Sequence, residues 1–448
     1  MTASLENLTQ ALLDAARAAG AEAADSIAVS GDSQSIEVLN GALEHAERSE
    51  GIDLGIRVLI GLRQASVSSS DIRLDTINAM AERAVAMALE APEDPHCGLA
   101  DPDQLAKSWD IESFELADPS DAPLPAELQE NALEAAAAAF AIKGVTQVQG
   151  AGAGYSRSAI HLAASNGFSG GYERTSRSTS CGAIVGEGLS MERDYCGEGR
   201  IFQADLPSAA EIGRIAGERA VARANPEKPP TGAFPVIFDE RISSGLIGHL
   251  IAAINGSSIA RGSSWLKDAL GEQVLPENLS LIEDPHRPRT SGSKPFDAEG
   301  LPTTRRAIVE NGALQSWTLD LATARKLGLE STANAGRGTS APPSPSAGNL
   351  TLTQGPDTRE DLIAMMGTGL IVTSLIGSSI NPNTGDYSRG ASGFWVENGI
   401  ITGPVNECTI AGNLREMLAT IRPANDGRAH LSRVIPSLLV EGLTIAGA

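Results

Sequence analysis

The order of amphipathic segments constrains the fold most, because the same order occurs twice in the first half of the chain. Residues 5–19 carry leucine and alanine at helical spacing, short alternating runs such as SIEVLNG and GIDLGIRVLIG follow, and a helical pattern returns at 76–91. The order helix, strands, helix recurs over 126–144, 145–199 and 208–224. We therefore expect an α+β fold in which an antiparallel sheet lays one face on its helices.

Asn-Gly pairs mark the expected turns between strands. Asn40-Gly41 lies between two alternating runs and predicts a tight hairpin. Asn166-Gly167 occupies the corresponding place in the second unit, and we expect it to play the same role.

A proline-rich segment, NPEKPPTGAFP, predicts the main domain boundary. The N-terminal domain is expected over residues 1–228, with sub-units at about 1–95 and 120–224. The C-terminal domain, 229–448, is expected to be β-rich, because RAIVENGALQSWTLD and GFWVENGIITGPV each suggest a hairpin folded at Asn-Gly. The Gly/Ser/Pro segment 331–349 is predicted to be a long loop, which is typical of functional or disordered segments.

Charge and hydropathy exclude several classes of function. The net charge of −22 disfavours binding to nucleic acid or to an anionic membrane, because both need clustered Lys and Arg. No apolar stretch approaches ~18 residues, so no membrane span is expected. The first residues, MTASLENLTQALLDAARAAGA, suggest an acidic amphipathic helix and not a signal peptide. We expect a cytoplasmic protein whose four cysteines are reduced and mostly buried.

The C-terminal half contains four long, specific strings: KPFDAEGLPTTRRAIVENGALQSWTLDLATARKLG (294–328), STANAGRG (331–338), NPNTGDYSRGASGFWVENG (381–399) and TIAGNL (409–414). These strings resemble the TldD/PmbA family, also called the modulator of DNA gyrase family. The resemblance extends through ASNGFSGGYERTSRSTS and GLSMERDY, so it covers nearly the whole chain. TGDYSRGASGFWVENG resembles the TldE/PmbA branch more than the TldD branch.

The resemblance implies a heterodimeric zinc peptidase that trims unfolded peptides and peptide-like precursors. In that family the TldD branch supplies a helix with an HExxxH motif and a further Cys, and the TldE/PmbA branch is its partner. In SSGLIGHL the corresponding positions hold Ser244 for the first ligand, Gly245 for the general base and His249 for the second ligand. The region of the third ligand, SLIGSSINPNTGDY, has no Cys.

A hydrolytic zinc needs three protein ligands, an open position for water and a nearby carboxylate. We therefore predict no catalytic residue, no metal site and no cofactor in this chain, and we expect the zinc in a TldD-like partner. His249 is then a packed, hydrogen-bonded histidine. The predicted function is that of a non-catalytic subunit acting with the partner on unfolded peptides. The alternatives are an autonomous peptidase with an unrecognised site, or a regulatory protein of the gyrase-modulator type. A homodimer of the isolated chain also stays open.

Four residues are candidates for contact with the peptide or the partner. Phe394 and Trp395 alternate on a strand, so one should lie in the core and the other on a sheet face covered by the partner or by another element. Gly385 and Gly390 would allow an extended peptide to approach a sheet edge, and ordinary packing is the alternative. Cys408 could act as a nucleophile only if a histidine adjoins it in space.

Two charged segments have competing interpretations. Asp297 and Glu299 could form a general acid/base pair. The favoured interpretation is a turn in which one of these carboxylates forms a surface ion pair with Arg305 or Arg306. The basic segment DPHRPR (284–289) suggests a solvated loop, with contact to a partner as the alternative.

Overall fold

The structure, a computed structural model, describes residues 4–447. The N-terminal half contains two copies of one arrangement, a helix, three antiparallel strands and a second helix, as the sequence predicted. The first copy comprises α1 (Leu5–Ala18), β1 (Ala23–Leu39), β2 (Ala42–Ile60), β3 (Arg63–Ser69) and α2 (Leu74–Glu90). The second comprises α3 (Pro125–Phe140), β4 (Val145–Ala164), β5 (Ser169–Val185), β6 (Glu192–Arg200) and α4 (Ala209–Ala222).

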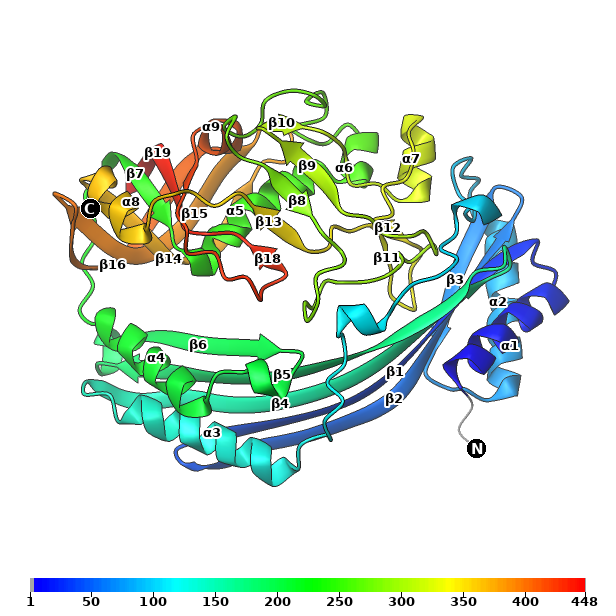
Figure 1. Cartoon of the computed structure of the whole chain (residues 1–448), viewed down its shortest axis with the longest axis horizontal. Helices are drawn as coiled ribbons and strands as arrows, with labels where there is room; N and C mark the ends of the chain where they lie inside the picture. The colour runs from blue at the N-terminus through cyan, green and yellow to red at the C-terminus, as the bar shows by residue number, and fades with distance from the viewer. Residues whose placement is uncertain (1–3, 448) are drawn as a thin grey trace.

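The two copies share a single sheet, which the sequence did not predict. Its strand order is β3-β2-β1-β4-β5-β6, and antiparallel pairing of β1 with β4 joins the copies, from Asp25 opposite Ala164 to Val38 opposite Ala151. The sheet is long and curved (Figure 1). Its outer face carries α1 and α2 at one end and α3 and α4 at the other, each pair over its own apolar core. Its inner face is turned toward the C-terminal domain.

Short 3-10 turns lie in the segments that connect these elements. They are η1 (Pro102–Gln104), η2 (Glu112–Phe114), η3 (Gly188–Ser190) and η4 (Gln203–Asp205).

The C-terminal domain is rich in strands, and five of them close into a barrel. The sheet order is β16-β15-β14-β7-β19-β17, and β16 also pairs with β19 through Thr409–Ala411. This second pairing uses the edge of β16 that would otherwise be free. The strands of this sheet, including β17 outside the closed ring, and the helices of this part of the chain are β7 (Gly232–Phe238), α5 (Glu240–Ala253), α6 (Gly256–Ala260), α8 (Arg359–Met366), β14 (Gly369–Ile380), β15 (Asp386–Glu397), β16 (Ile400–Asn413), α9 (Leu414–Ala419), β17 (Arg422–Pro423) and β19 (Leu438–Ala446).

A smaller sheet packs beside the barrel in the order β10-β9-β8-β13-β18. The remaining elements are β8 (Leu281–Glu283), β9 (Arg306–Glu310), β10 (Ala313–Leu314), α7 (Leu321–Leu327), β11 (Ala335–Gly336), β12 (Ser344–Pro345), β13 (Leu350–Leu352) and β18 (Arg433–Val434).

Three of the expected Asn-Gly turns are tight hairpins. Both residues of each pair have positive φ, as type I′ turns require, and the pairs are Asn40-Gly41, Asn311-Gly312 and Asn398-Gly399. Asn166-Gly167 lies in the turn between β4 and β5, as predicted, but the geometry of this turn differs from that of the other three. Only Gly167 has positive φ, and the turn is wider because the Ala164 amide donates to the Phe168 carbonyl.

The predicted loop 331–349 is ordered and locks the two domains together. It inserts Arg337, whose side chain is fully buried, onto Asp25 on the inner face of β1. Arg57 on β2 donates to the same carboxylate, with 2.7 Å from Nε to Oδ2. Burial raises the pKa of Asp25, but Arg337 and Arg57 outweigh it and hold that pKa below its ordinary value.

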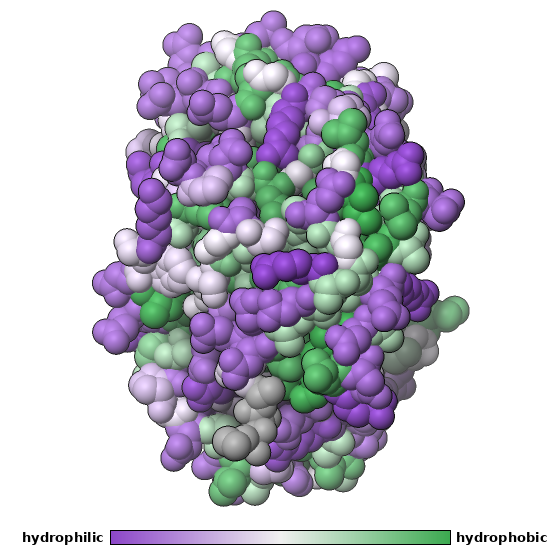
Figure 2. All heavy atoms as spheres, turned by 90° about the vertical axis from the view of Figure 1, so that its right-hand side faces the viewer, coloured by the Kyte–Doolittle hydropathy of each residue, from purple (hydrophilic) through white to green (hydrophobic). Residues whose placement is uncertain are grey.

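The surface at the α1 and α2 end mixes polar and apolar side chains (Figure 2). Within residues 4–447, no helix combines the length and the apolar character needed to cross a membrane.

The contact between loop 331–349 and β2 gives the first testable prediction. A Cβ at Gly55 would overlap the backbone carbonyl of Thr339, whereas a Cβ at Gly51 on the same strand meets nothing within 4 Å. Gly55→Ala should therefore lower the free energy of unfolding by about 1–3 kcal/mol through overpacking. Gly51→Ala, the matched control, should be neutral or slightly stabilising. Denaturant unfolding measures both, and equal midpoints for the two variants would contradict the close interdomain packing.

Candidate functional site

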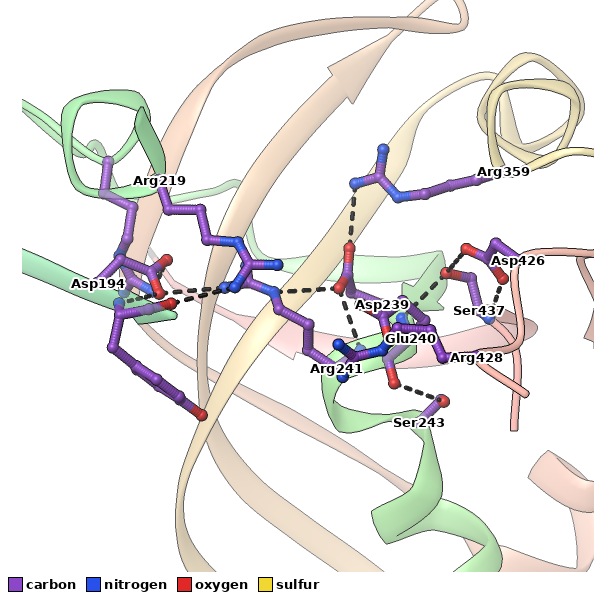
Figure 3. A network of polar contacts seen from close by, with 12 residues as sticks. Asp194, Arg219, Asp239, Glu240, Arg241, Ser243, Arg359, Asp426, Arg428 and Ser437 are labelled. Carbon is purple, nitrogen blue, oxygen red and sulfur yellow. Dashed lines mark hydrogen bonds and ion pairs between the residues drawn. The ribbon is translucent and has the colours of Figure 1, made fainter. Parts of the chain in front are cut away.

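Helix α5 carries the degenerate motif, and an ionic network fixes where the helix begins. Asp239 follows β7 and caps α5 by accepting from the Arg241 amide. Its carboxylate also binds two guanidinium groups, with 3.2 Å to Arg241 Nε and 3.2 Å to Arg359 Nη2 (Figure 3). A capped and charged first turn holds the helix end in one position.

The same network bridges the two domains. Arg241 reaches Asp194 on β6 at 3.1 Å. Arg428, from the C-terminal domain, contacts Glu240 at 2.9 Å and Glu198 on β6 at 2.6 Å. Burial raises the pKa of Glu240, although Arg428 opposes this shift. Because these side chains come from β6, α5 and a distant loop, the N-terminal end of α5 is held against both domains (Figure 3).

A cleft of about 960 Å³ opens beside this network. Ser244 and Gly245, the degenerate motif positions, line it from α5. Glu192–Tyr195 on β6 and Thr373–Ile376 on β14 also line the cleft. The structure therefore places both motif positions at a cavity whose size is typical of ligand sites.

The residues at this position do not fit a zinc site. Gly245 leaves open space where a general base would stand, since a Cβ there meets nothing within 4 Å. His249 packs edge-on against Tyr387 at 5.7 Å between ring centroids, and burial lowers its pKa, with Arg389 adding to the shift. Arg389 also lines the cleft, and its positive charge opposes a cation at His249. No group of three His, Cys, Asp or Glu that could hold a metal ion occurs in the described part of the chain.

Cys408 also lines the cleft, but it is a poor nucleophile. The thiol is buried and donates to the Ala391 carbonyl at 3.2 Å. Burial raises its pKa to about 11, so the thiol stays protonated at neutral pH. Nucleophilic cysteines instead have lowered pKa values.

The two aromatic candidates lie on opposite faces of β15. Trp395 is buried in the main C-terminal core and packs edge-on against Phe234 at 5.0 Å. Phe394 is half-buried against a second core that includes Leu362 and Ile363 of α8. Another element of the chain thus covers the outward ring, and a role for either ring in binding a partner stays a prediction.

The two glycine candidates are constrained by packing inside the chain. Gly385 has a φ of 81°, which favours glycine, and a Cβ there would lie 3.4 Å from Trp265. A Cβ at Gly390 would lie 2.5 Å from Cγ2 of Ile376. Contact of these glycines with a peptide stays a prediction.

Asp297 and Glu299 shape a turn, as expected, but they are buried. Asp297 Oδ1 accepts from the amides of Glu299 and Leu301, and Glu299 Oε2 accepts from the Leu321 amide at the start of α7. Burial raises the pKa of Asp297. Burial, and then the neighbouring Asp297, raise the pKa of Glu299 to about 8.

The expected surface pairing of these carboxylates was wrong. Arg306 instead binds Glu283 at 2.8 Å, and Arg305 lies 3.8 Å from Asp284. The spacing of FDAEG indicates a turn, but it carries no information about burial, which depends on the distant elements that pack over it.

The DPHRPR segment binds other parts of the same chain and is not a free solvated loop. Arg287 donates to backbone carbonyls in the 429–431 loop. Arg289 is exposed but reaches Glu115 and Asp205, each at 3.0 Å. The segment therefore connects the two domains.

Three regions of the chain match domains of one family of metallopeptidases. Residues 231–447 match the PmbA/TldA metallopeptidase C-terminal domain. Residues 24–88 match domain 1 of the same metallopeptidases, and residues 118–224 match their central domain. The chain belongs to the PmbA/TldD metallopeptidase family.

Relatives place the chain in the PmbA/TldE branch of this family. It is 37% identical over 415 residues to the metalloprotease PmbA of Escherichia coli O157:H7, covering 92% of this chain and 90% of the relative. It is 38% identical over 411 residues to a metalloprotease PmbA homolog of Haemophilus influenzae, covering 90% and 88%.

Solved structures of this family share the fold. A proposed modulator of DNA gyrase from Bacteroides thetaiotaomicron superposes with a TM-score of 0.91 at 28% identity, over 99% of this chain and 100% of that one. TldE from Thermococcus kodakarensis has a TM-score of 0.86 over 98% and 100%, and at 22% identity it shows the fold alone.

Sequence reasoning found the motif positions of this PmbA/TldD member but missed the network that anchors them. Asp194, Arg241 and Arg428 are far apart in the chain, so no local pattern joins them. The one available signal was Asp239, a helix-capping residue type between a buried strand and a helix.

Glu299 yields a prediction about pH. Its folded pKa lies above the ordinary value of 4.5, so its contribution to stability is complete below that value and is lost as pH rises through about 8. Glu299→Gln should remove this loss. As pH rises from 4.5 to about 8, the free energy of unfolding of the variant should therefore increase relative to that of the original protein.

Denaturant unfolding across this pH range measures the difference. Glu310→Gln, which changes an exposed carboxyl on β9, is the control and should follow the original protein at every pH. If the Glu299→Gln curve also runs parallel to the original protein, Glu299 is ionised in the folded state and its raised pKa is refuted.

Proposed function

We propose that this chain is the metal-less subunit of a heterodimeric zinc peptidase whose TldD-like partner carries the zinc. One observation carries the proposal: Ser244 and Gly245, which the resemblance aligns with a metal ligand and a general base, both line the cleft from α5. Neither residue can perform those roles, because zinc hydrolysis needs a set of ligands and a carboxylate near the bound water. Membership of a metallopeptidase family supports the proposal that the chemistry takes place in another subunit.

The role of this chain would be to form one wall of a closed chamber and to guide an unfolded peptide toward the partner's zinc. The ionic network around Asp239 supports a rigid wall, because it holds α5 against both domains. The open space at Gly245 supports passage of a chain past the helix. Positioning of a substrate by fixed groups is a recognised contribution to catalysis.

Peptide cleavage tests this proposal directly. The purified chain alone should not hydrolyse casein, whereas the chain mixed with a TldD-like subunit should, and a chelator should stop the reaction. The chain alone should also contain no stoichiometric zinc by elemental analysis after metal loading and gel filtration. Robust, chelator-sensitive cleavage by the isolated chain would instead support an autonomous peptidase.

Two substitutions at one position test the cleft itself. Gly245 lies inside a helix and faces open space, so Gly245→Ala should raise the free energy of unfolding by about 1 kcal/mol and leave cleavage by the mixed pair intact. Gly245→Trp should place an indole ring in the cleft and displace the peptide. Because displacement of a substrate from its reactive position slows the reaction, cleavage by the mixed pair should fall at least about tenfold.

Sedimentation of each mixed pair, with melting of each subunit, shows whether assembly and folding are preserved. If Gly245→Trp assembles normally and cleaves as fast as Gly245→Ala, peptides do not pass this wall and the proposed role of the cleft is rejected.

A further inference from the structure

A second cavity, of about 340 Å³, lies between the inner face of the large sheet and the C-terminal domain. Its floor includes Ser156 and Ser158 on β4 and Ser176 on β5. Ser156 lies directly opposite Ser176 in the sheet, so these hydroxyls share one face. His430 and Ser432, in a loop of the C-terminal domain, cover the floor. This cavity is separate from the cleft beside α5.

The titratable groups that line this cavity are all basic, although the chain has a net charge of −22. They are Arg174, Arg200, Arg289 and His430. Burial lowers the pKa of His430, and Arg200 adds to the shift, so the imidazole is neutral at pH 7. The cavity therefore presents three guanidinium groups and a neutral imidazole.

The carboxylates that neutralise two of these arginines lie outside the cavity lining. Glu198 binds Arg200 at 2.8 Å, and Glu115 and Asp205 bind Arg289. These two arginines therefore contribute hydrogen-bond donors to the cavity more than net charge.

Arg174 is different, because it has no ion pair within residues 4–447. Its guanidinium donates instead to the backbone carbonyls of Ser291 and Ser293. Those two bonds leave further N–H donors, and they leave the positive charge of Arg174 without a counter-charge. The hydroxyls of Ser156, Ser158 and Ser176 make no hydrogen bond in the described part of the chain, so they are also available.

A guanidinium with free donors, several hydroxyls and no lining carboxylate fits an oxyanion. Arginine binds a planar carboxylate through two parallel hydrogen bonds, and these charge-assisted bonds are stronger than neutral ones. The volume is at the small end of the range for ligand sites, which suits a terminal group better than a whole side chain with its neighbours.

The floor of the cavity continues as an open surface of small residues along the inner face. Ser33, Ser35, Gly154, Ser178 and Gly199 lie on this face of β1, β4, β5 and β6 and are exposed or half-buried. Small side chains leave room for an extended chain to lie over the strands.

Strand β6 connects the cavity with the cleft beside α5. Gly199 lines the cavity and Tyr195 lines the cleft, about 13 Å away along the strand. That separation corresponds to about four residues of an extended peptide. A peptide held by its end in the cavity would thus reach the cleft.

We infer that the arginine-lined cavity binds a carboxylate, and that the carrier is the C-terminal carboxylate of an extended peptide. The identity of the carrier rests on the proposed function, whereas carboxylate binding can be measured on this chain alone. Carboxylate binding and the proposed function can therefore be refuted independently, because binding is tested on the chain alone and cleavage is tested only on the mixed pair.

The experiment compares a short unstructured peptide with its C-terminal amide, binding to the full-length chain without a partner, by titration calorimetry. The free acid should bind at least about tenfold more tightly than the amide. Excess acetate should compete with it. Equal binding of acid and amide, or no binding of either, would overturn the inference. Displacement by inorganic phosphate but not by acetate would overturn it too, because the site would then be a phosphate site.

Three variants locate the effect. Arg174→Gln should reduce the preference for the free acid, and Ser158→Asp should abolish it by placing a carboxylate on the cavity floor. Ser49→Asp is the matched control, because it adds the same charge to the same face of the sheet, on β2, outside both the cavity lining and the open surface of small residues, and it should keep the preference. Thermal melting checks folding. Loss of the preference in all three variants would show a general charge effect and no site in the cavity.

Discussion

The buried carboxylate of Asp25 is the constraint on which the arrangement of the two domains depends. It stands on β1, the strand that joins the duplicated units, and it contacts Arg57 from the same sheet and Arg337 from the other domain. Exchanging such a group for apolar residues can be neutral, but removing one partner leaves a buried charge and is strongly destabilising. Loop 331–349 must therefore stay docked on the sheet, which sets the position of the cavity between sheet and loops and of the cleft beside α5.

Local patterns predicted much of the secondary structure. Helical spacing, strand alternation and Asn-Gly pairs act over a few residues, so both helix–strands–helix units and the hairpins at Asn311 and Asn398 could be read from the sequence. The shared sheet could not, because Asp25 pairs with Ala164 at a distance in the chain that no periodicity spans. Closure of the barrel through β16 and β19 was hidden for the same reason.

The candidate site shows the same division. A family motif located Ser244 and Gly245, and the structure placed them at a cleft. The motif carried no information about Asp194 and Arg428, whose contacts with α5 arise only when β6 and a distant loop converge. The sequence predicted a surface turn at Asp297 and Glu299, because charged residues are usually exposed. In the structure both carboxyls are buried and have raised pKa values.

The surface of glycine and serine on the inner face has a consequence for ligand selection. It offers no side-chain pockets, because residues such as Gly154 and Ser178 project little beyond the backbone. Such a surface cannot discriminate by the size or hydrophobicity of what lies on it. Any preference must arise where larger groups stand, at the ends of the surface. Sequence variation in the middle of a ligand would therefore be tolerated without any adaptation of this protein.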